Sequence, residues 1–139
     1  MARIVAIDYG TKRVGIAVTD PARIIASPLT TVHANKLIQF LKDYEKNEGI
    51  ALFVIGLPKN LTNKDTDLTQ TVRNFITHLK RVFPDKKVFT IDERFTSKIA
   101  FDTMLQGGMK KKERRNKENI DKISATIILQ SFLEQGSVT

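Results

Sequence analysis

Short apolar runs alternate with amphipathic stretches along the chain, and this pattern is typical of an α/β protein. The runs at 3–8 and 50–56 are apolar without clean alternation, as strands covered on both faces are. Other stretches place apolar residues at the spacing of a helix that buries one face. The predicted strands are 3–8, 14–18, 24–30, 50–56 and 87–91, and the predicted helices are 34–48, 68–82, a stretch from 96 or 97 to 105, and 119–134.

The connections between the runs predict how the strands pair. Only Tyr9 to Arg13 separates the first run from the second, which is too short for a helix, so these strands should form an antiparallel hairpin. Pro28 predicts an edge position for the third strand. The later order of helix, strand, helix and strand lets the first, fourth and fifth strands run parallel. The predicted fold is a mixed five-stranded sheet, with a three-stranded antiparallel part plus parallel strands, flanked by helices.

Local signals mark some of the turns. Gly10 can take a positive φ in the hairpin turn. Asn35 or the region of His33 is expected to cap the first helix, and Gly49 is expected to end it.

Composition narrows the class of protein. The 139 residues are most simply a single domain, 1–139, and no apolar stretch approaches the ~20 residues that cross a bilayer, so no membrane partner is expected. The absence of cysteine excludes disulfides, iron–sulfur clusters and thiolate catalysis, and it fits a cytoplasmic location. A net charge of +8 favours nucleic acid or another polyanion as partner.

Acidic residues follow two of the strands that should run parallel. Asp8 ends the first strand, and Asp92 and Glu93 follow the fifth. Ligands of such sheets bind beyond the carboxyl ends of the parallel strands, so these carboxylates should meet at one edge, together with the turn at Gly56-Leu57-Pro58. The simpler interpretation of Asp8 is a turn carboxylate that accepts hydrogen bonds from nearby amides.

The last predicted helix supplies a third acid. Asp121, Ala125, Ile128 and Phe132 share one stripe of this helix, and the apolar members predict that the stripe faces the protein. An inward carboxylate needs a partner. A salt bridge, or the favourable interaction of an acid with a helix amino terminus, would explain it, and so would a bound cation.

Clustered carboxylates are the ligands that Mg²⁺ and Mn²⁺ prefer. We therefore expect Asp8, Glu93 and Asp121 to hold a divalent metal, with two ions promoting hydrolysis of a phosphodiester. His33 and His78 are expected to lie away from this edge in surface or packing roles.

Four motifs stand in a specific order: Asp8 to Gly15, Gly56-Leu57-Pro58, Asp92 to Ser97 with a basic run after it, and Asp121 followed by Ser124-Ala125 and Ile128 to Leu133. Together they resemble the YqgF/RuvX family over essentially the whole chain. The resemblance implies an RNase H-like fold and a cytoplasmic nuclease that matures the 5′ end of pre-16S ribosomal RNA in ribosome biogenesis. It also implies an older description as a Holliday-junction resolvase.

Site residues carry over from the family by position. The resemblance implies Asp8, Glu93 and Asp121 as the catalytic and metal-binding acids, with Asp92 as the alternative to Glu93, because adjacent strand residues point to opposite faces. The loop after Gly56-Leu57-Pro58 departs from the Asp-Gly-Ser-like sequence that is usual in the family. Basic residues near the proposed edge are candidates for contact with nucleic acid: Lys12, Arg13, Arg94, Lys110, Lys111, Lys112, Arg114 and Arg115.

Alternative functions remain at this stage. Structured RNA and branched DNA are both candidate substrates, and the chain is expected to be a monomer or a weak homodimer. A basic RNA-binding assembly factor without catalysis is the non-enzymatic alternative. An ATPase fragment is a further one, since Asp8 to Thr11 also resembles the first phosphate loop of the actin and sugar-kinase superfamily.

Overall fold

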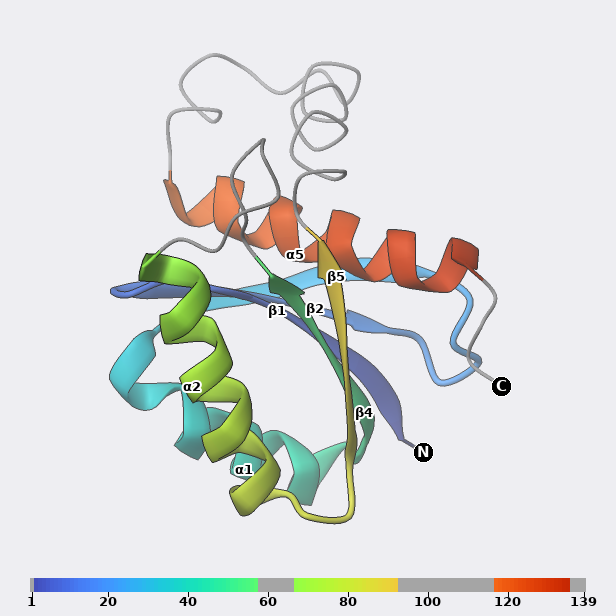
Figure 1. The fold of residues 1–139 in the computed structure, drawn as a ribbon. Helices are drawn as coiled ribbons and strands as arrows, with labels where there is room; N and C mark the ends of the chain where they lie inside the picture. Colours follow the sequence, from blue (N-terminus) through green and yellow to red (C-terminus); the bar gives the residue numbers. More distant parts are fainter. Residues whose placement is uncertain (1, 58–66, 93–116, 136–139) are drawn as a thin grey trace.

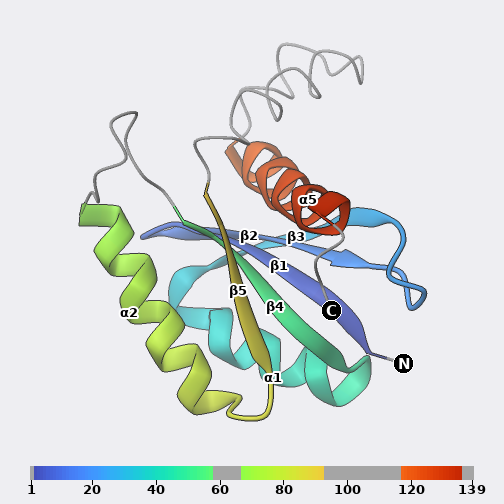
Figure 2. The ribbon, with the colours of Figure 1, turned by 45° about the vertical axis from the view of Figure 1, so that its right-hand side comes forward.

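The computed structural model describes residues 2–57, 67–92 and 117–135, without the side chains of residues 67, 117–122 and 135. One five-stranded sheet has the order β3-β2-β1-β4-β5. Helices α1 and α2 lie on one face of this sheet and α5 lies on the other (Figures 1 and 2). The elements are β1 (Arg3–Tyr9), β2 (Arg13–Thr19), β3 (Ala26–His33), a 3-10 turn (Ala34–Lys36), α1 (Leu37–Asn47), β4 (Ile50–Leu57), α2 (Asp67–Val82), β5 (Lys87–Asp92) and α5 (Lys117–Gln135).

The strand pairing confirms the predicted sheet. β1 pairs antiparallel with β2, and β2 pairs antiparallel with β3, which forms the edge that Pro28 predicted. β4 pairs parallel with both β1 and β5. The carboxyl ends of β1, β4 and β5 therefore meet at one edge of the sheet, as expected.

The third strand lies later in the chain than predicted. Ile24 and Ile25 belong to the turn before β3, where their backbone N–H groups donate to Asp20 Oδ1 at 2.8 and 2.7 Å. The amide of Ile25, followed by that of Ile24, lowers the pKa of Asp20. Their side chains are 72% and 61% exposed. The two apolar residues resemble the start of a strand in sequence, but the aspartate takes the amides that a strand would use.

The signals around the first helix are largely confirmed. His33 Nδ1 accepts a hydrogen bond from the Asn35 N–H at 3.3 Å at the start of the 3-10 turn that leads into α1. Gly49 follows α1 with a φ of +86°, which a residue with a side chain rarely adopts. Gly10 does not use the positive φ that glycine permits in a turn. A Cβ there would lie 2.5 Å from the carbonyl oxygen of Arg13, so close approach across the hairpin turn explains this glycine.

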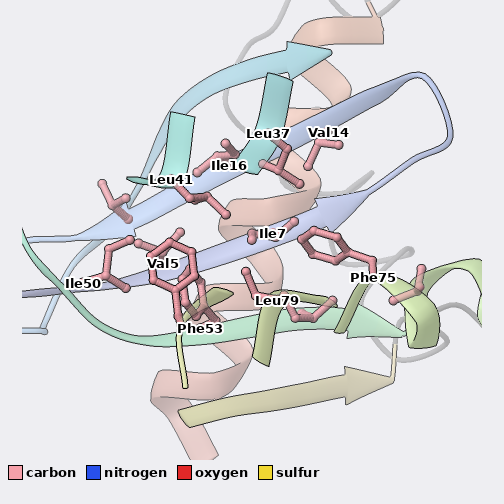
Figure 3. Packing of buried hydrophobic residues seen from close by; sticks show 14 residues of the cluster. Val5, Ile7, Val14, Ile16, Leu37, Leu41, Ile50, Phe53, Phe75 and Leu79 are labelled. Carbon is pink, nitrogen blue, oxygen red and sulfur yellow. The ribbon is translucent and has the colours of Figure 1, made fainter. Parts of the chain in front are cut away.

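Apolar side chains form a separate core on each face. Large residues fill the space between the sheet and the helices α1 and α2, as Figure 3 shows. The core where α5 crosses the sheet combines large side chains, such as Ile128 and Phe132, with three fully buried alanines, Ala6, Ala17 and Ala125. The alternation of each strand between these cores fixes which face each of its side chains occupies.

The helix predicted from residue 96 or 97 to 105 and the basic run at 109–118 fall largely outside the described residues. Within the ranges that the structure describes, none of the helices has the length and apolar character to cross a membrane.

Candidate functional site

Asp8 occupies the second-to-last position of β1 and faces α5. Ile4 and Ala6 belong to the core under α5, whereas Val5 and Ile7 belong to the core under α1 and α2. Because strand side chains alternate, Asp8 continues the row of Ile4 and Ala6. Its half-buried carboxylate therefore lies on the α5 face, at the edge where the parallel strands end.

Both strands beside Asp8 place a glycine at its level. Gly15 of β2 pairs with Asp8 directly. Gly56 of β4 stands at the same height, since Ile55 pairs with Ile7 one residue earlier. Gly15 lies two residues before Ala17, and Gly56 lies two residues after Val54. Because Ala17 and Val54 pack in the core under α5, both glycines occupy positions on the α5 face. The floor on either side of this carboxylate is therefore backbone, which lets a ligand approach closely.

Asp92 lies on the opposite face from Asp8. Ile91 packs in the core under α5, while Val88 packs in the core under α1 and α2. Alternation along β5 then directs the half-buried Asp92 toward the α2 side of the sheet. Asp92, the alternative ligand, thus does not share a face with Asp8, and Glu93 lies outside the described residues.

Helix α5 has the orientation that its apolar stripe predicted. Ala125, Ile128 and Phe132 are each at most 3% exposed. Asp121 belongs to α5 one helical turn before Ala125, and its side chain lies outside the description. The end of α5 lies beside the β2–β3 turn, where Leu133 and Ile25 line one depression. The start of the helix therefore lies toward the other end of the sheet, as Figures 1 and 2 show.

Among the side chains that the structure describes, no three acids or histidines are grouped as a metal site would group them. Of the three predicted ligands, only Asp8 has a described side chain. At the described part of the edge, the groups that could bind a metal are the Asp8 carboxylate and backbone carbonyl oxygens. Oxygen donors of this kind suit hard divalent cations.

The β1–β2 turn brings two of the predicted basic residues to this edge. Lys12 is exposed and Arg13 is half-buried, and both line a cleft of about 390 Å³ with Gly10, Thr11 and Leu68 of α2. The turn is anchored to the sheet, since the Ala34 N–H donates to the Lys12 carbonyl at 2.9 Å. The other predicted contacts, Arg94, Lys110, Lys111, Lys112, Arg114 and Arg115, lie outside the described residues.

One histidine was misplaced by the sequence argument. His33 pairs with Arg13 across β2 and β3, so it lies at the same end of the sheet as Asp8 rather than away from it. The register of the edge strand places it there, and only the position of β3 in the sheet could have revealed this. His78 lies exposed on α2.

Comparison with known proteins gives one family over nearly the whole chain. A family model described as "RuvX: Holliday junction resolvase" matches residues 2–135. A protein of Amoebophilus asiaticus is 57% identical over 133 residues, which are 96% of this chain and 94% of that protein. One of Flavobacterium johnsoniae is 53% identical over 133 residues, covering 96% of each chain. Both carry the name "Putative pre-16S rRNA nuclease".

Solved structures share the fold at low sequence identity. The chain aligns with RuvC of T. thermophilus, solved in complex with a Holliday junction substrate, at 10% identity and a TM-score of 0.60, covering 99% of this chain and 98% of RuvC. The Fowlpox virus resolvase, solved with Holliday junction DNA, aligns at 13% identity and a TM-score of 0.61, covering 97% and 99%. These likenesses confirm the RNase H-like fold.

Proposed function

Because the chain belongs to the RuvX family, we propose that it is a cytoplasmic nuclease that hydrolyses phosphodiester bonds at the 5′ end of pre-16S ribosomal RNA. The observation that carries the proposal is the position of Asp8. This carboxylate lies on the α5 face at the edge where three parallel strands end, between two glycines that leave the backbone open beside it. A phosphate with its metal can approach such a floor closely.

The proposed metal ligands are Asp8, Glu93 and Asp121, binding Mg²⁺ or Mn²⁺, with two ions in the complete site. Asp8 fits this role because a carboxylate is a hard oxygen donor. We choose Glu93 over Asp92 because Asp92 lies on the α2 side of the sheet, and Asp121 because α5 carries it one turn before the buried Ala125. When bound, divalent cations supply an activated water and stabilise the charge that develops on the leaving oxygen.

The basic residues hold the polyanion in this proposal. Lys12 and Arg13 lie at the anchored β1–β2 turn, at the end of the sheet that carries Asp8, and a guanidinium can bind a phosphate through two hydrogen bonds. Arg94 and the run from Lys110 to Arg115 extend the same role to the segments around the acids. Such contacts give affinity for the backbone of a structured RNA without sequence choice.

The test is cleavage of an end-labelled precursor of 16S ribosomal RNA, with Mg²⁺ or Mn²⁺, by the wild type and by Asp8→Asn. We expect the substitution to lower the cleavage rate by about 100- to 1000-fold or more, since it removes a charged ligand at the centre of the site. Affinity for the RNA without metal should change little. Cleavage by pure Asp8→Asn protein at the wild-type rate would refute the proposed site.

A second candidate function is resolution of branched DNA, which the description of the family model favours. A resolvase cuts two strands symmetrically and so needs a dimer, whereas maturation of one RNA end suits a monomer. A four-way DNA junction run beside the RNA, with the mass of the protein in solution measured in parallel, separates the two. Binding of both substrates without metal-dependent cleavage of either would favour the non-catalytic assembly factor instead.

A further inference from the structure

We propose that His33 and Arg13 form a subsite for a backbone phosphate on the β3 side of Asp8. The subsite deepens the proposed nuclease function and rests on it for the identity of the ligand, a nucleic-acid strand. His33 has so far been given only a capping or surface role, and the family comparison assigns it no contact with nucleic acid.

The two side chains share the face of the sheet that carries Asp8. Val14 of β2 and its partner Val32 of β3 pack toward α1 and α2, so the neighbouring pair Arg13 and His33 points to the α5 side. From strand spacings, Arg13 lies about 8 Å from Asp8 and His33 about 12 Å, measured between Cα atoms. At that separation His33 would contact a phosphate that flanks the scissile one.

The hydrogen bond of His33 fixes how its ring presents itself. Nδ1 accepts the Asn35 N–H, so in the neutral ring the proton resides on Nε2. Nε2 is on the opposite side of the ring from Nδ1, and the side chain is exposed. The ring therefore presents an N–H donor to solvent, in an orientation that the capped 3-10 turn holds.

A backbone hydrogen bond connects the two segments that carry the subsite. The Ala34 N–H donates to the Lys12 carbonyl at 2.9 Å, which ties the end of β3 to the β1–β2 turn. This bond fixes the two backbone segments relative to each other, and the Asn35 N–H holds the ring of His33. Preorganised donors of this kind bind with less loss of side-chain entropy.

The charge of the surrounding segments suits an anion. Residues 9–19 and 21–42 contain no aspartate or glutamate, while Lys12, Arg13 and Lys36 lie on the turn and on the segment that follows His33. A phosphate there would meet donors and positive charge from both segments, with Asp8 of β1 as an acid on the same face.

The wild-type protein allows a direct test, because its sequence has only two histidines. Imidazole ¹⁵N–¹H NMR correlations are recorded while a short single-stranded RNA is added without divalent metal. We expect the Nε2 resonance of His33 to shift in a saturable manner, while that of His78, exposed on α2, stays in place. Equal shifts for both rings, or none for His33, would overturn the subsite.

A matched variant separates binding from capping. His33→Asn keeps a side-chain oxygen that can accept the Asn35 N–H, since asparagine is a strong cap residue, but it removes the ring donor. We expect about a 3- to 10-fold loss of RNA affinity, the range for one hydrogen bond, with an unchanged melting temperature. The KM for cleavage should rise by the same factor while kcat stays constant. Unchanged affinity in the folded variant would overturn the subsite.

Both binding measurements are made without metal, so they do not depend on catalysis. A wild-type protein that fails to cleave, but whose His33 resonance shifts and whose His33→Asn variant binds weakly, would refute the proposed nuclease and support the subsite. Cleavage that depends on Asp8 but is indifferent to His33→Asn would support the nuclease and refute the subsite.

Discussion

The two faces of the sheet end differently at the edge that carries Asp8. On the α1 and α2 face, large side chains fill the core up to the last residue of β1, where Tyr9 stacks on Phe75 of α2 with 4.5 Å between the ring centroids. On the α5 face, the core gives way to Asp8 between Gly15 and Gly56. One face is closed by packing, and the other ends in a carboxylate on open backbone.

This difference shows that two adjacent residues of one strand can have different roles, because they lie on opposite faces of the sheet. Asp8 and Tyr9 are neighbours in the chain, but alternation sends one to each face. The same holds for Ile91 and Asp92 on β5, with Asp92 on the face of Tyr9. The face of a residue, more than its position in the sequence, therefore indicates whether it can take part in the proposed site.

The largest effect that tests this comparison comes from the two adjacent acids after β5. Glu93→Gln should lower the cleavage rate by about 100- to 1000-fold, because it removes a proposed metal ligand. Asp92→Asn should leave the rate within a few-fold of the wild type, because Asp92 lies on the α2 side. Rates are measured on the same labelled RNA at saturating metal, and the reverse order of the two variants would break the assignment of faces.

One core substitution on each face should separate loss of stability from loss of cleavage. The substitution under α5 should lower the cleavage rate more, and the one under α2 should lower the stability more. Ala125 is fully buried where α5 meets the sheet, and leucine there should destabilise the protein by about 1 to 3 kcal/mol through overpacking. It should also displace α5, and a shift of about 1 Å in a catalytic group can cost up to about 100-fold in rate. Single-turnover cleavage is measured well below the melting temperature.

The control for Ala125→Leu is Leu79→Ala in the core under α2. Leu79 is fully buried, and its truncation should cost about 2 to 5 kcal/mol, more than Ala125→Leu. We expect its cleavage rate below the melting temperature to stay near that of the wild type. If rates followed stability regardless of face, the comparison would fail.

The smallest effect on cleavage is expected for Tyr9→Leu, although Tyr9 follows Asp8 directly. The substitution removes an aromatic pair worth about 0.5 to 1.5 kcal/mol beyond burial, so thermal unfolding should occur at a lower temperature. Cleavage should change by less than a few-fold. Phe40→Leu, in the pair with Tyr44 on α1, is the matched control for loss of an aromatic contact far from Asp8.

The pairing directions of the strands and the positions of α1, α2 and α5 were predictable because hydrophobic periodicity and connection length determine them. The run at 50–56 is apolar throughout, and it is β4, flanked by β1 and β5. The position of Pro28 at an edge followed from its missing N–H. These signals are local in sequence, and the sheet that they predict has the observed pairing.

Other features depend on partners that the sequence does not reveal. The start of β3 is set by Asp20, which binds the amides of Ile24 and Ile25 and excludes two strand-like residues from the sheet. Gly10 is required by a carbonyl three residues away, not by its own φ. His33 came to the edge of Asp8 through the register of β3 on β2. Of the candidate site, Asp8 lies at the predicted edge of the sheet, while the catalytic and metal-binding roles of Asp8, Glu93 and Asp121 stay predictions.

The order of the elements has a consequence for the newly made chain. Helix α5 is synthesised after all five strands, yet it covers β1 and β2, the earliest two of them. The core under α1 and α2 can close while the chain is still being extended, but the other face of the sheet stays bare until α5 emerges. With Asp121 as one of the proposed acids, a nascent chain would lack its cutting centre until α5 has emerged from the ribosome and packed on the sheet.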